Sequence, residues 1–461
     1  MAVLLVHAEH EAARDPITVV DPLEVVVKAD EPVDVMPEVN VRVEDLGAFR
    51  QLLRELLVVA GYERLRFLEH VVHDGSVYVA SGPLADVLIY ADSLRSPEMR
   101  HEVPLAIPDP FLYAERNGQK HVVVTSFELD RIKAVVPELE AIAPEELGLD
   151  ELYNQGLPRE EIELEIAVRA AHRFGVEQAA VPPTFPVGLA DHLRKNGIEV
   201  TADRDRFTSR RRAKNEAELA GIRRAQRAAE AGMTAARELL RAAEQSNGDL
   251  VIDGEPLTCE LLKAAVEQAF TVNGAFADEF IVSHGAQTAV GHDMGSGPIA
   301  SGEPVCLDLF PRDRESGCFA DMTRVFVVGE VPEELAEYHR LCKEALERSV
   351  AAVKPGVAGS ELHRISCAVF EEAGYPTLLS KPPGEVLKDG FYHSLGHGVG
   401  LEVHEEPSLG RAPGELVAGD VIAVEPGLYR HGYGGCRLED LVLVTDDGAE
   451  VLTDYPYDLA P

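Results

Sequence analysis

Four acidic residues in the second half of the chain lie inside apolar, β-prone segments, where a carboxylate is costly to bury unless it is paired or binds a cation. Asp308 lies in PVCLDLF and Asp321 in CFADMTRVFVV, whereas Glu425 lies in DVIAVEPGLY and Glu439 in CRLEDLVLVT. Acidic residues make up 80 of the 461 positions, so most are expected at the surface. The apolar neighbours single out these four as candidates for metal chemistry.

Each pair of acids is predicted to meet across a hairpin. With DRES (residues 313–316) as the turn, Asp308 faces Asp321, and with RHGYG as the loop, Glu425 faces Glu439. Directly opposed residues have Cβ atoms roughly 4.5–5.5 Å apart. Four close carboxylates repel and raise one another's pKa values unless cations hold them together. We therefore expect a two-metal site built mainly from carboxylate oxygens.

An imidazole ligand is expected from YHSLGHGVGLEVHEEP, which contains His393, His397 and His404. On an extended strand His393 and His397 share a face, whereas His404 falls on the other face unless the intervening glycines let the backbone bend. A single histidine is by default structural. Three histidines this close, beside Glu405–Glu406–Pro407, favour a functional role, and one imidazole among carboxylates suits Mn, Co, Fe or Zn.

The first half of the chain alternates helical and strand-like segments, which predicts an α/β domain. In order, these are LGAFRQLLRELLVVAGY, LRFLEHVV, SVYVAS, DVLIYADS, HVVVTSFEL, PREEIELEIAVRAAHRFG, EQAAVPP, VGLADHLRKNG and IEVTAD. The basic patch RFTSRRRAKNEAEL is then predicted to open one long helix that reaches about Glu244 and to dock on acidic neighbours. We divide the chain into an extension of uncertain structure (1–45), an N-terminal domain (46–205) and a C-terminal domain (206–461).

The C-terminal half shows a faint internal duplication. A long helix, ELAGIRRAQRAAEAGMTAARELL, is followed by a second, LTCELLKAAVEQAFTVNGA, and the pattern recurs as ELAEYHRLCKEALERSVAAV followed by SELHRISCAVFEEAGY. Each helix pair leads into strands. The repeat favours two helix-helix-strand units around a shared sheet.

Composition excludes several classes of partner. The formal net charge of −37 is expected to repel nucleic acid and anionic lipid, so neither is a predicted partner. This acidity either keeps the protein soluble or marks a salt-adapted host. No apolar run is long enough to span a bilayer and no basic flank precedes the apolar start, so we predict a cytoplasmic protein without a membrane anchor. The six cysteines, widely spaced and without a CxxC pair, are expected to be buried and reduced.

The order of the motifs resembles the pita-bread-fold metallopeptidases, which include methionine aminopeptidase, aminopeptidase P and prolidase. The motifs are Asp308, DMTR at Asp321, GHGVGLEVHEEP at His397, VEPG at Glu425 and CRLED at Glu439. The resemblance implies an α/β creatinase-like N-terminal domain and an α+β pita-bread catalytic domain with pseudo-twofold duplication. The interval from Asp308 to Asp321 is two residues longer than usual in this family, but an even insertion keeps each side chain on its face.

The same resemblance implies roles for individual residues. Asp308 would bind one metal, Asp321 and Glu439 would bridge both, and His397 with Glu425 would hold the other. Further positions implied to contact the substrate are His292 in SHGAQTAVGHD, His404, and His393, which resembles a position of the proline-specific branch. Arg437 is expected to orient Glu439, to meet the substrate, or to form a salt bridge within the cluster.

The implied activity is hydrolysis of the Xaa-Pro bond at the N-terminus of peptides or in dipeptides, by a hydroxide that bridges two divalent metals. Manganese is the first expectation, with Co, Zn or Fe as alternatives. Glu425 would move the proton, and His292 and His404 would stabilise charge on the scissile carbonyl. A homodimer is also implied. Two alternatives stay open: an amide hydrolase of the same fold that acts on a small metabolite, and a metal-free binding protein, which the complete ligand set disfavours.

Overall fold

The computed structural model describes residues 41–42, 72–73, 76–77 and 86–461. Strands β1 (Val41–Arg42), β2 (Val72–His73) and β3 (Ser76–Val77) form a small antiparallel sheet of order β1-β3-β2. The predicted extension 1–45, the helix LGAFRQLLRELLVVAGY, and the strands LRFLEHVV and SVYVAS lie almost wholly outside the described residues.

Residues 86–202 form an α/β domain around a mixed sheet of order β7-β6-β5-β4-β8-β9. Alternation along β4 directs Val87 and Ile89 to one face, where they pack on α2 and α3, and Leu88 to the other, where it packs on α5 and α6. The strands are β4 (Asp86–Ala91), β5 (Phe111–Arg116), β6 (Gln119–Val123), β7 (Glu140–Ile142), β8 (Gln178–Val181) and β9 (Glu199–Ala202), and the helices are α2 (Pro97–Glu102), α3 (Leu129–Val135), α4 (Leu149–Asn154), α5 (Arg159–Phe174) and α6 (Val187–Lys195), with short 3-10 turns η1 (Ser126–Glu128) and η2 (Pro144–Leu147). The helices and strands predicted from DVLIYADS onward in this domain are confirmed, except that the strand predicted over HVVVTSFEL ends at Val123 and is followed by η1 and α3.

The basic patch forms a helix of its own. Helix α7 (Arg204–Arg212) ends before the extended residue Ala213, and α8 (Glu216–Ala242) begins after Asn215. Asn215 Oδ1 accepts from the Glu218 amide and Glu218 Oε2 accepts from the Asn215 amide, both at 2.9 Å, a capping box that starts a new helix. The prediction of one continuous helix is therefore wrong. The domain boundary near residue 205 stays a prediction.

The docking of the basic patch on acidic residues is confirmed. One of these ion pairs, between Arg210 and Glu102, predicts how the stability of the protein depends on pH. Glu102 of α2 is buried and accepts hydrogen bonds from Tyr113 Oη (2.9 Å), Lys120 Nζ (2.9 Å) and Arg210 Nε (2.7 Å). Burial alone would raise the pKa of Glu102, but Arg210 and then Lys120 outweigh it and lower the pKa to about 2, from 4.5 for an unperturbed glutamate.

Because the folded-state pKa of Glu102 is depressed, its contribution to stability is present above about pH 4.5 and is lost as the pH falls towards about 2. Glu102→Gln is expected to lower the free energy of unfolding at neutral pH by about 3 kcal/mol, because it breaks a buried ion pair. It should also flatten the acid side of the stability curve. Urea unfolding between pH 2 and 7 measures both effects, with Glu163→Gln, whose side chain is 43% exposed, as control. An acid limb as steep as that of the wild type would contradict the assignment.

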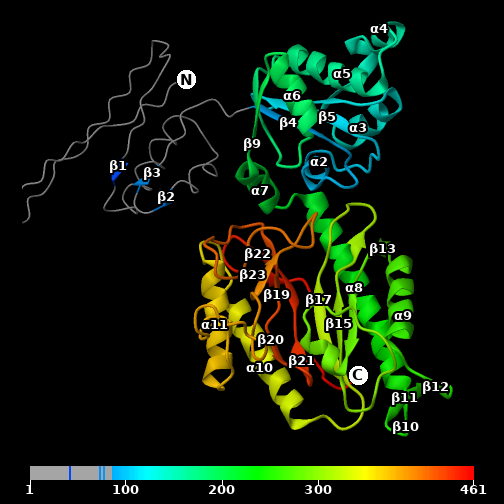
Figure 1. The fold of residues 1–461 in the computed structure, drawn as a ribbon, viewed down its shortest axis with the longest axis vertical. Helices are drawn as coiled ribbons and strands as arrows, with labels where there is room; N and C mark the ends of the chain where they lie inside the picture. The colour runs from blue at the N-terminus through cyan, green and yellow to red at the C-terminus, as the bar shows by residue number, and fades with distance from the viewer. Residues whose placement is uncertain (1–40, 43–71, 74–75, 78–85) are drawn as a thin grey trace, which may run out of the picture. The chain divides into compact units, whose positions relative to one another are not determined.

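Two helix pairs enclose the strands of the C-terminal domain (Figure 1). Helix α8 packs on α9 (Cys259–Val272), where a Cβ at Gly232 would lie 2.7 Å from the Phe270 ring, so glycine permits their close approach. These helices cover the sheet β14-β15-β17. Helices α10 (Glu333–Ala351) and α11 (Gly359–Glu372) cover the sheet β18-β19-β22-β23 and the ribbon β20-β21.

The predicted duplication into two helix-helix-strand halves is confirmed, but each half has its own sheet. A backbone hydrogen bond from Glu439 N to Thr323 O (3.2 Å) links the two. The strands are β13 (Ala275–Phe276), β14 (Ile281–His284), β15 (Pro304–Leu309), β16 (Arg312–Asp313), β17 (Met322–Val327), β18 (Gly396–Gly398), β19 (Val421–Val424), β20 (Gly427–Arg430), β21 (Gly434–Arg437), β22 (Asp440–Val444) and β23 (Ala449–Val451), preceded by a separate sheet of β10 (Glu244–Ser246), β11 (Asp249–Ile252) and β12 (Glu255–Pro256).

All six cysteines are buried with free thiols, as predicted. Among the helices of the described residues, none combines the length and the apolar character that a membrane crossing requires.

Candidate metal centre

Strands β15 and β17 bring Asp308 and Asp321 to one side of the first sheet, in a register that differs from the predicted one. Asp308 pairs with Thr323, so Asp321 lies two residues further along and on the same face. The predicted DRES turn is present, since Gly317 N donates to Asp313 O at 2.9 Å, but Arg312 pairs with Phe319 instead of with Gly317, so the hairpin register is shifted by two residues. Strand β16 also pairs with β13, and Asp313 binds Arg224 through hydrogen bonds of 3.0 and 2.8 Å. An even shift leaves both carboxylates on the predicted side.

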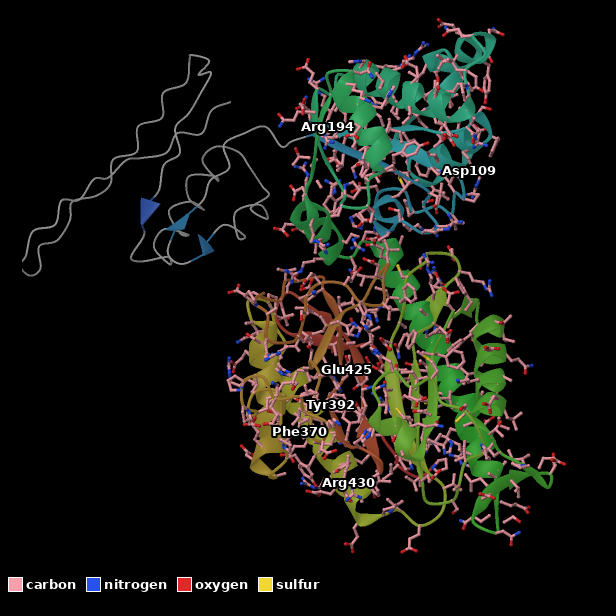
Figure 2. All side chains as sticks on the ribbon, viewed as in Figure 1. Asp109, Arg194, Phe370, Tyr392, Glu425 and Arg430 are labelled. Atoms are coloured by element: carbon pink, nitrogen blue, oxygen red, sulfur yellow. The ribbon has the colours of Figure 1, made fainter. Side chains whose placement is uncertain are left out.

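The second hairpin has the predicted register. Gly427 pairs with Arg437 in β20 and β21, and Val424 pairs with Asp440 in β19 and β22. Glu425 and Glu439 lie between these two pairs and therefore face one another. Figure 2 shows Glu425 in the interior of the domain, among the strands that lie between the two helix pairs.

His397 lies on β18, and its ring points towards the acids. Its Nδ1 is 3.1 Å from the Gly398 carbonyl, so Nε2 is left facing Glu425 Oε1 at 3.7 Å and Asp321 Oδ2 at 3.8 Å. Beyond the strand the backbone turns back, as the glycines were expected to allow. This turn places His404 against His397, with ring centroids 4.3 Å apart.

Asp321, His397 and Glu439 are the compact centre of the cluster, because each offers a ligand atom within 4.8 Å of the other two. Glu425 adjoins them through His397. After burial and Glu439, the neighbouring Asp308 also raises the pKa of Asp321, but Asp308 Oδ2 is itself held by Arg437. All five sequence-predicted ligands therefore converge on one place, although their individual roles stay predictions.

Burial dominates the electrostatics of the cluster. It raises the pKa values of Asp321 and Glu439 well above their usual range, and the neighbouring carboxylates raise them further. Burial also raises the pKa of Glu425 to about 8, although Arg437 opposes the shift. For His397, burial and then His404 lower the pKa to about 4, so its imidazole is neutral at pH 7 with a lone pair free on Nε2.

The surroundings of one carboxylate oxygen, Asp321 Oδ1, indicate whether metal ions fit this site. Asp321 Oδ1 is buried and has no hydrogen-bond partner within the described part of the chain. A buried carboxylate oxygen without a partner is unfavourable, and repulsion from the other acids adds to its cost. Divalent cations would give this oxygen a partner and would offset the repulsion between the carboxylates. Carboxylate oxygens with one neutral imidazole suit Mn, Co, Fe or Zn. The residues therefore fit a divalent metal centre.

Arg437 is buried beneath the cluster and forms a salt bridge within it, which was one of the three predicted alternatives. Its Nη2 lies 2.5 Å from Asp308 Oδ2, its Nη1 donates to Tyr429 Oη at 3.1 Å, and its Nε donates to Thr323 Oγ1 at 3.4 Å. Thr323 in turn donates to Glu439 Oε2 at 2.6 Å. The guanidinium thus connects the carboxylates contributed by the two halves.

Tyr429 and Thr323 were not singled out from the sequence. The alternation of side chains along a strand could have indicated them. Thr323 is two residues from Asp321 and Tyr429 is four from Glu425, so each shares a face with a candidate ligand. Tyr429 Oη also bonds to His393 Nε2 at 2.8 Å. The extended strand expected to carry both His393 and His397 is wrong, because β18 begins only at Gly396.

His292, predicted to contact substrate, follows the turn η3 (Gly285–Ala289). It lies close enough to His404 to act on its titration, since burial and then His292 lower the pKa of His404. The structure therefore brings His292 into the neighbourhood of His404. Their contact with a substrate stays a prediction.

Comparison with known proteins agrees with this geometry. Residues 220–446 match metallopeptidase family M24. An Xaa-Pro dipeptidase of Pyrococcus horikoshii is 31% identical over 285 residues, which cover 60% of this chain and 74% of that protein. An Xaa-Pro dipeptidase of Pyrococcus furiosus is 38% identical over 194 residues, which cover 41% of this chain and 52%, about half, of that protein.

Solved structures show the same arrangement of domains. The crystal structure of the prolidase from Pyrococcus horikoshii OT3 has a TM-score of 0.61 at 27% identity and covers 81% of this chain and 95% of that one. The X-Pro aminopeptidase from Thermotoga maritima MSB8 shares the fold, with a TM-score of 0.65 at 22% identity over 81% of this chain and 97% of that one. The predicted fold class, an N-terminal α/β domain followed by a pita-bread domain, is confirmed. The chain belongs to metallopeptidase family M24.

Proposed function

We propose that this protein is a dinuclear-metal peptidase that hydrolyses the Xaa-Pro bond at the N-terminus of peptides or in dipeptides. The observation that carries the proposal is Asp321 Oδ1, which has no partner in the described residues and lies in a cluster of four carboxylates and one neutral imidazole. Two relatives named Xaa-Pro dipeptidase support the substrate class. We assign Asp308 to one metal, Asp321 and Glu439 to both, and His397 with Glu425 to the other.

Two bound divalent cations would lower the pKa of water, so that a nucleophile is available near neutral pH. The chain's own residues would then complete the reaction. Glu425 takes the proton of the attacking water and delivers it to the leaving nitrogen, because a tertiary amide nitrogen must be protonated before it departs. His292 and His404 stabilise the charge that develops on the scissile carbonyl oxygen. We assign His393 to contact with the substrate, whereas Arg437 holds Asp308 and Thr323 from within the cluster.

A substrate panel tests the proposal. Xaa-Pro dipeptides, longer Xaa-Pro peptides, Met-peptides and matched Xaa-Ala peptides are supplied with Mn, Co or Zn separately, and release of the first residue is measured. We expect kcat/KM for Xaa-Pro to exceed that for Xaa-Ala by at least about tenfold, the scale on which a shaped apolar pocket discriminates. Manganese is expected to be the most effective of the three metals.

Other outcomes of the panel have defined meanings. Metal binding without hydrolysis of any Xaa-Pro bond would favour an amide hydrolase acting on a small metabolite. Absence of stoichiometric metal from the purified protein would favour a binding protein. The ratio of activity on dipeptides to activity on longer peptides separates a dipeptidase from an aminopeptidase. A cytoplasmic homodimer is part of the same proposal, and light scattering measures the oligomeric state.

A further inference from the structure

Three consecutive arginines at the end of α7 have different partners. Arg210 binds carboxylates of the N-terminal domain. Arg212 binds Asp420, through Nε to Oδ1 at 3.0 Å and Nη2 to Oδ2 at 2.6 Å. Arg211 binds Glu402 Oε2 through Nη2 at 2.7 Å and Glu405 Oε2 through Nη1 at 3.3 Å. Of the three, Arg211 therefore contacts the segment that carries His404.

A buried lysine completes the contact with this segment. Lys214 Nζ is hydrogen-bonded to Glu405 Oε1 and, at 2.6 Å, to the Arg211 carbonyl, and the side chains of Lys214 and Glu405 are only 2% and 4% exposed. A Cβ at Gly400 would lie 2.4 Å from Glu405 Oε1 and 2.7 Å from Lys214 Nζ, so glycine leaves room for the pair. Removing one partner of such a pair leaves a buried charge uncompensated.

Glu405 is joined to the metal centre by its backbone. Its amide donates to the Gly398 carbonyl and its carbonyl accepts from the Gly398 amide, both at 2.9 Å. Gly398 follows His397, and Glu405 follows His404, whose ring packs edge-on against His397. Residues 398–405 therefore form a closed turn, and its two ends lie beside the two histidines. The carboxylate of Glu405 anchors this turn to Lys214 and Arg211.

We propose that Lys214 and Arg211 are positioning residues for the reaction: through Glu405 they hold the 398–405 turn so that His404 stays directed at the metal cluster and the scissile carbonyl. The inference rests on the proposed function. It also links the N-terminal domain to the reaction, because Arg211 Nη2 lies 3.8 Å from Glu98 of α2. Neither Lys214 nor Arg211 has to touch the substrate for this role.

The first test does not depend on activity. Lys214→Met keeps most of the side-chain length and removes the charge, and Arg211→Met is a milder second variant that leaves the lysine in place. Arg212→Met is the matched control, because it breaks an ion pair at the same end of α7 with a carboxylate outside the turn. Hydrogen exchange by mass spectrometry, far below the unfolding temperature, should show exchange of residues 398–406 raised at least about tenfold in Lys214→Met and unchanged in the control.

The second test asks whether the effect passes through His404. Lys214→Met alone should lower kcat by roughly 10- to 100-fold, because a small misplacement of a stabilising group is costly in the transition state. In a His404→Ala background the same substitution should cost less than about threefold, whereas in a His292→Ala background it should keep its full effect. A merely structural role would lower kcat equally in all three backgrounds.

Equal losses in the three backgrounds, or unchanged exchange in residues 398–406, would overturn the inference. If the wild type hydrolyses no Xaa-Pro peptide, the proposed function fails, but the exchange measurement still decides whether Lys214 holds the turn. If Lys214→Met does not fold, Arg211→Met is carried through both tests with the same criteria.

Discussion

Asp321→Asn is expected to lower kcat/KM on an Xaa-Pro substrate at least about a thousandfold, a loss of about 4 kcal/mol in transition-state stabilisation. Asp321 lies at the centre of the cluster, within reach of both His397 and Glu439, and its Oδ1 has no partner among the described residues. A carboxamide has nearly the same shape, but it carries no charge and only one of its two terminal atoms can act as a ligand, so it holds a divalent cation less well than a carboxylate. Steady-state kinetics measure the loss of kcat/KM, and mass spectrometry measures the accompanying loss of bound metal.

Asp313→Asn is the matched control. Asp313 is as buried as Asp321, with 3% and 4% of their surfaces exposed, but its carboxylate is already paired with Arg224. We expect this control to lower thermal stability and to leave metal content and kcat nearly unchanged. Full metal content and activity in Asp321→Asn would show that the cluster is not the catalytic centre.

Arg437→Lys is expected to lower kcat/KM about 100-fold at saturating metal and to lower the free energy of unfolding by about 3 kcal/mol. The guanidinium reaches Asp308, Tyr429 and Thr323 with three different nitrogens. A lysine keeps the positive charge, but its single ammonium does not reproduce this planar fork. Asp308 and, through Thr323, Glu439 would then lose their fixed orientation.

Arg100→Lys separates these two losses. Arg100 is about as buried as Arg437, at 4% against 5% exposed, but it donates to the carbonyls of Glu315 and Ser316 instead of to the cluster. We expect a comparable loss of stability, measured by thermal unfolding, with kcat changed less than about threefold. If Arg437→Lys behaves like this control, the role of Arg437 is stability alone.

The second hairpin shows how far local sequence can predict a site. Its short loop fixes the pairing of β20 with β21, and the same register continues into β19 and β22, which sets Glu425 opposite Glu439. The first hairpin shows the limit. Its predicted register was wrong by two residues, because β16 pairs with β13 and Asp313 binds Arg224 on α8. These partners are distant in the sequence and leave no mark on the local pattern.

Helix α7 illustrates the same limit. The sequence predicted that its arginines would dock on acidic residues, but it did not predict which acids, nor that Asn215 would start a new helix. In a chain with 80 acidic residues, complementary charge is available almost everywhere. Lys214 pairs with Glu405 because both side chains are buried together beside Gly400.

By itself the sequence determined which side chains compose the cluster and which face of its strand each carboxylate occupies, because alternation along a strand is a local property. It also determined the two-domain α/β organisation and the pair of helices in each half of the catalytic domain. Only the tertiary structure decided that two separate sheets meet at Thr323 and Glu439, that Arg437 joins their carboxylates, and that Lys214 anchors the turn behind His404. The physical reason is that these contacts join residues more than a hundred positions apart, and their geometry depends on how whole elements pack rather than on any local pattern.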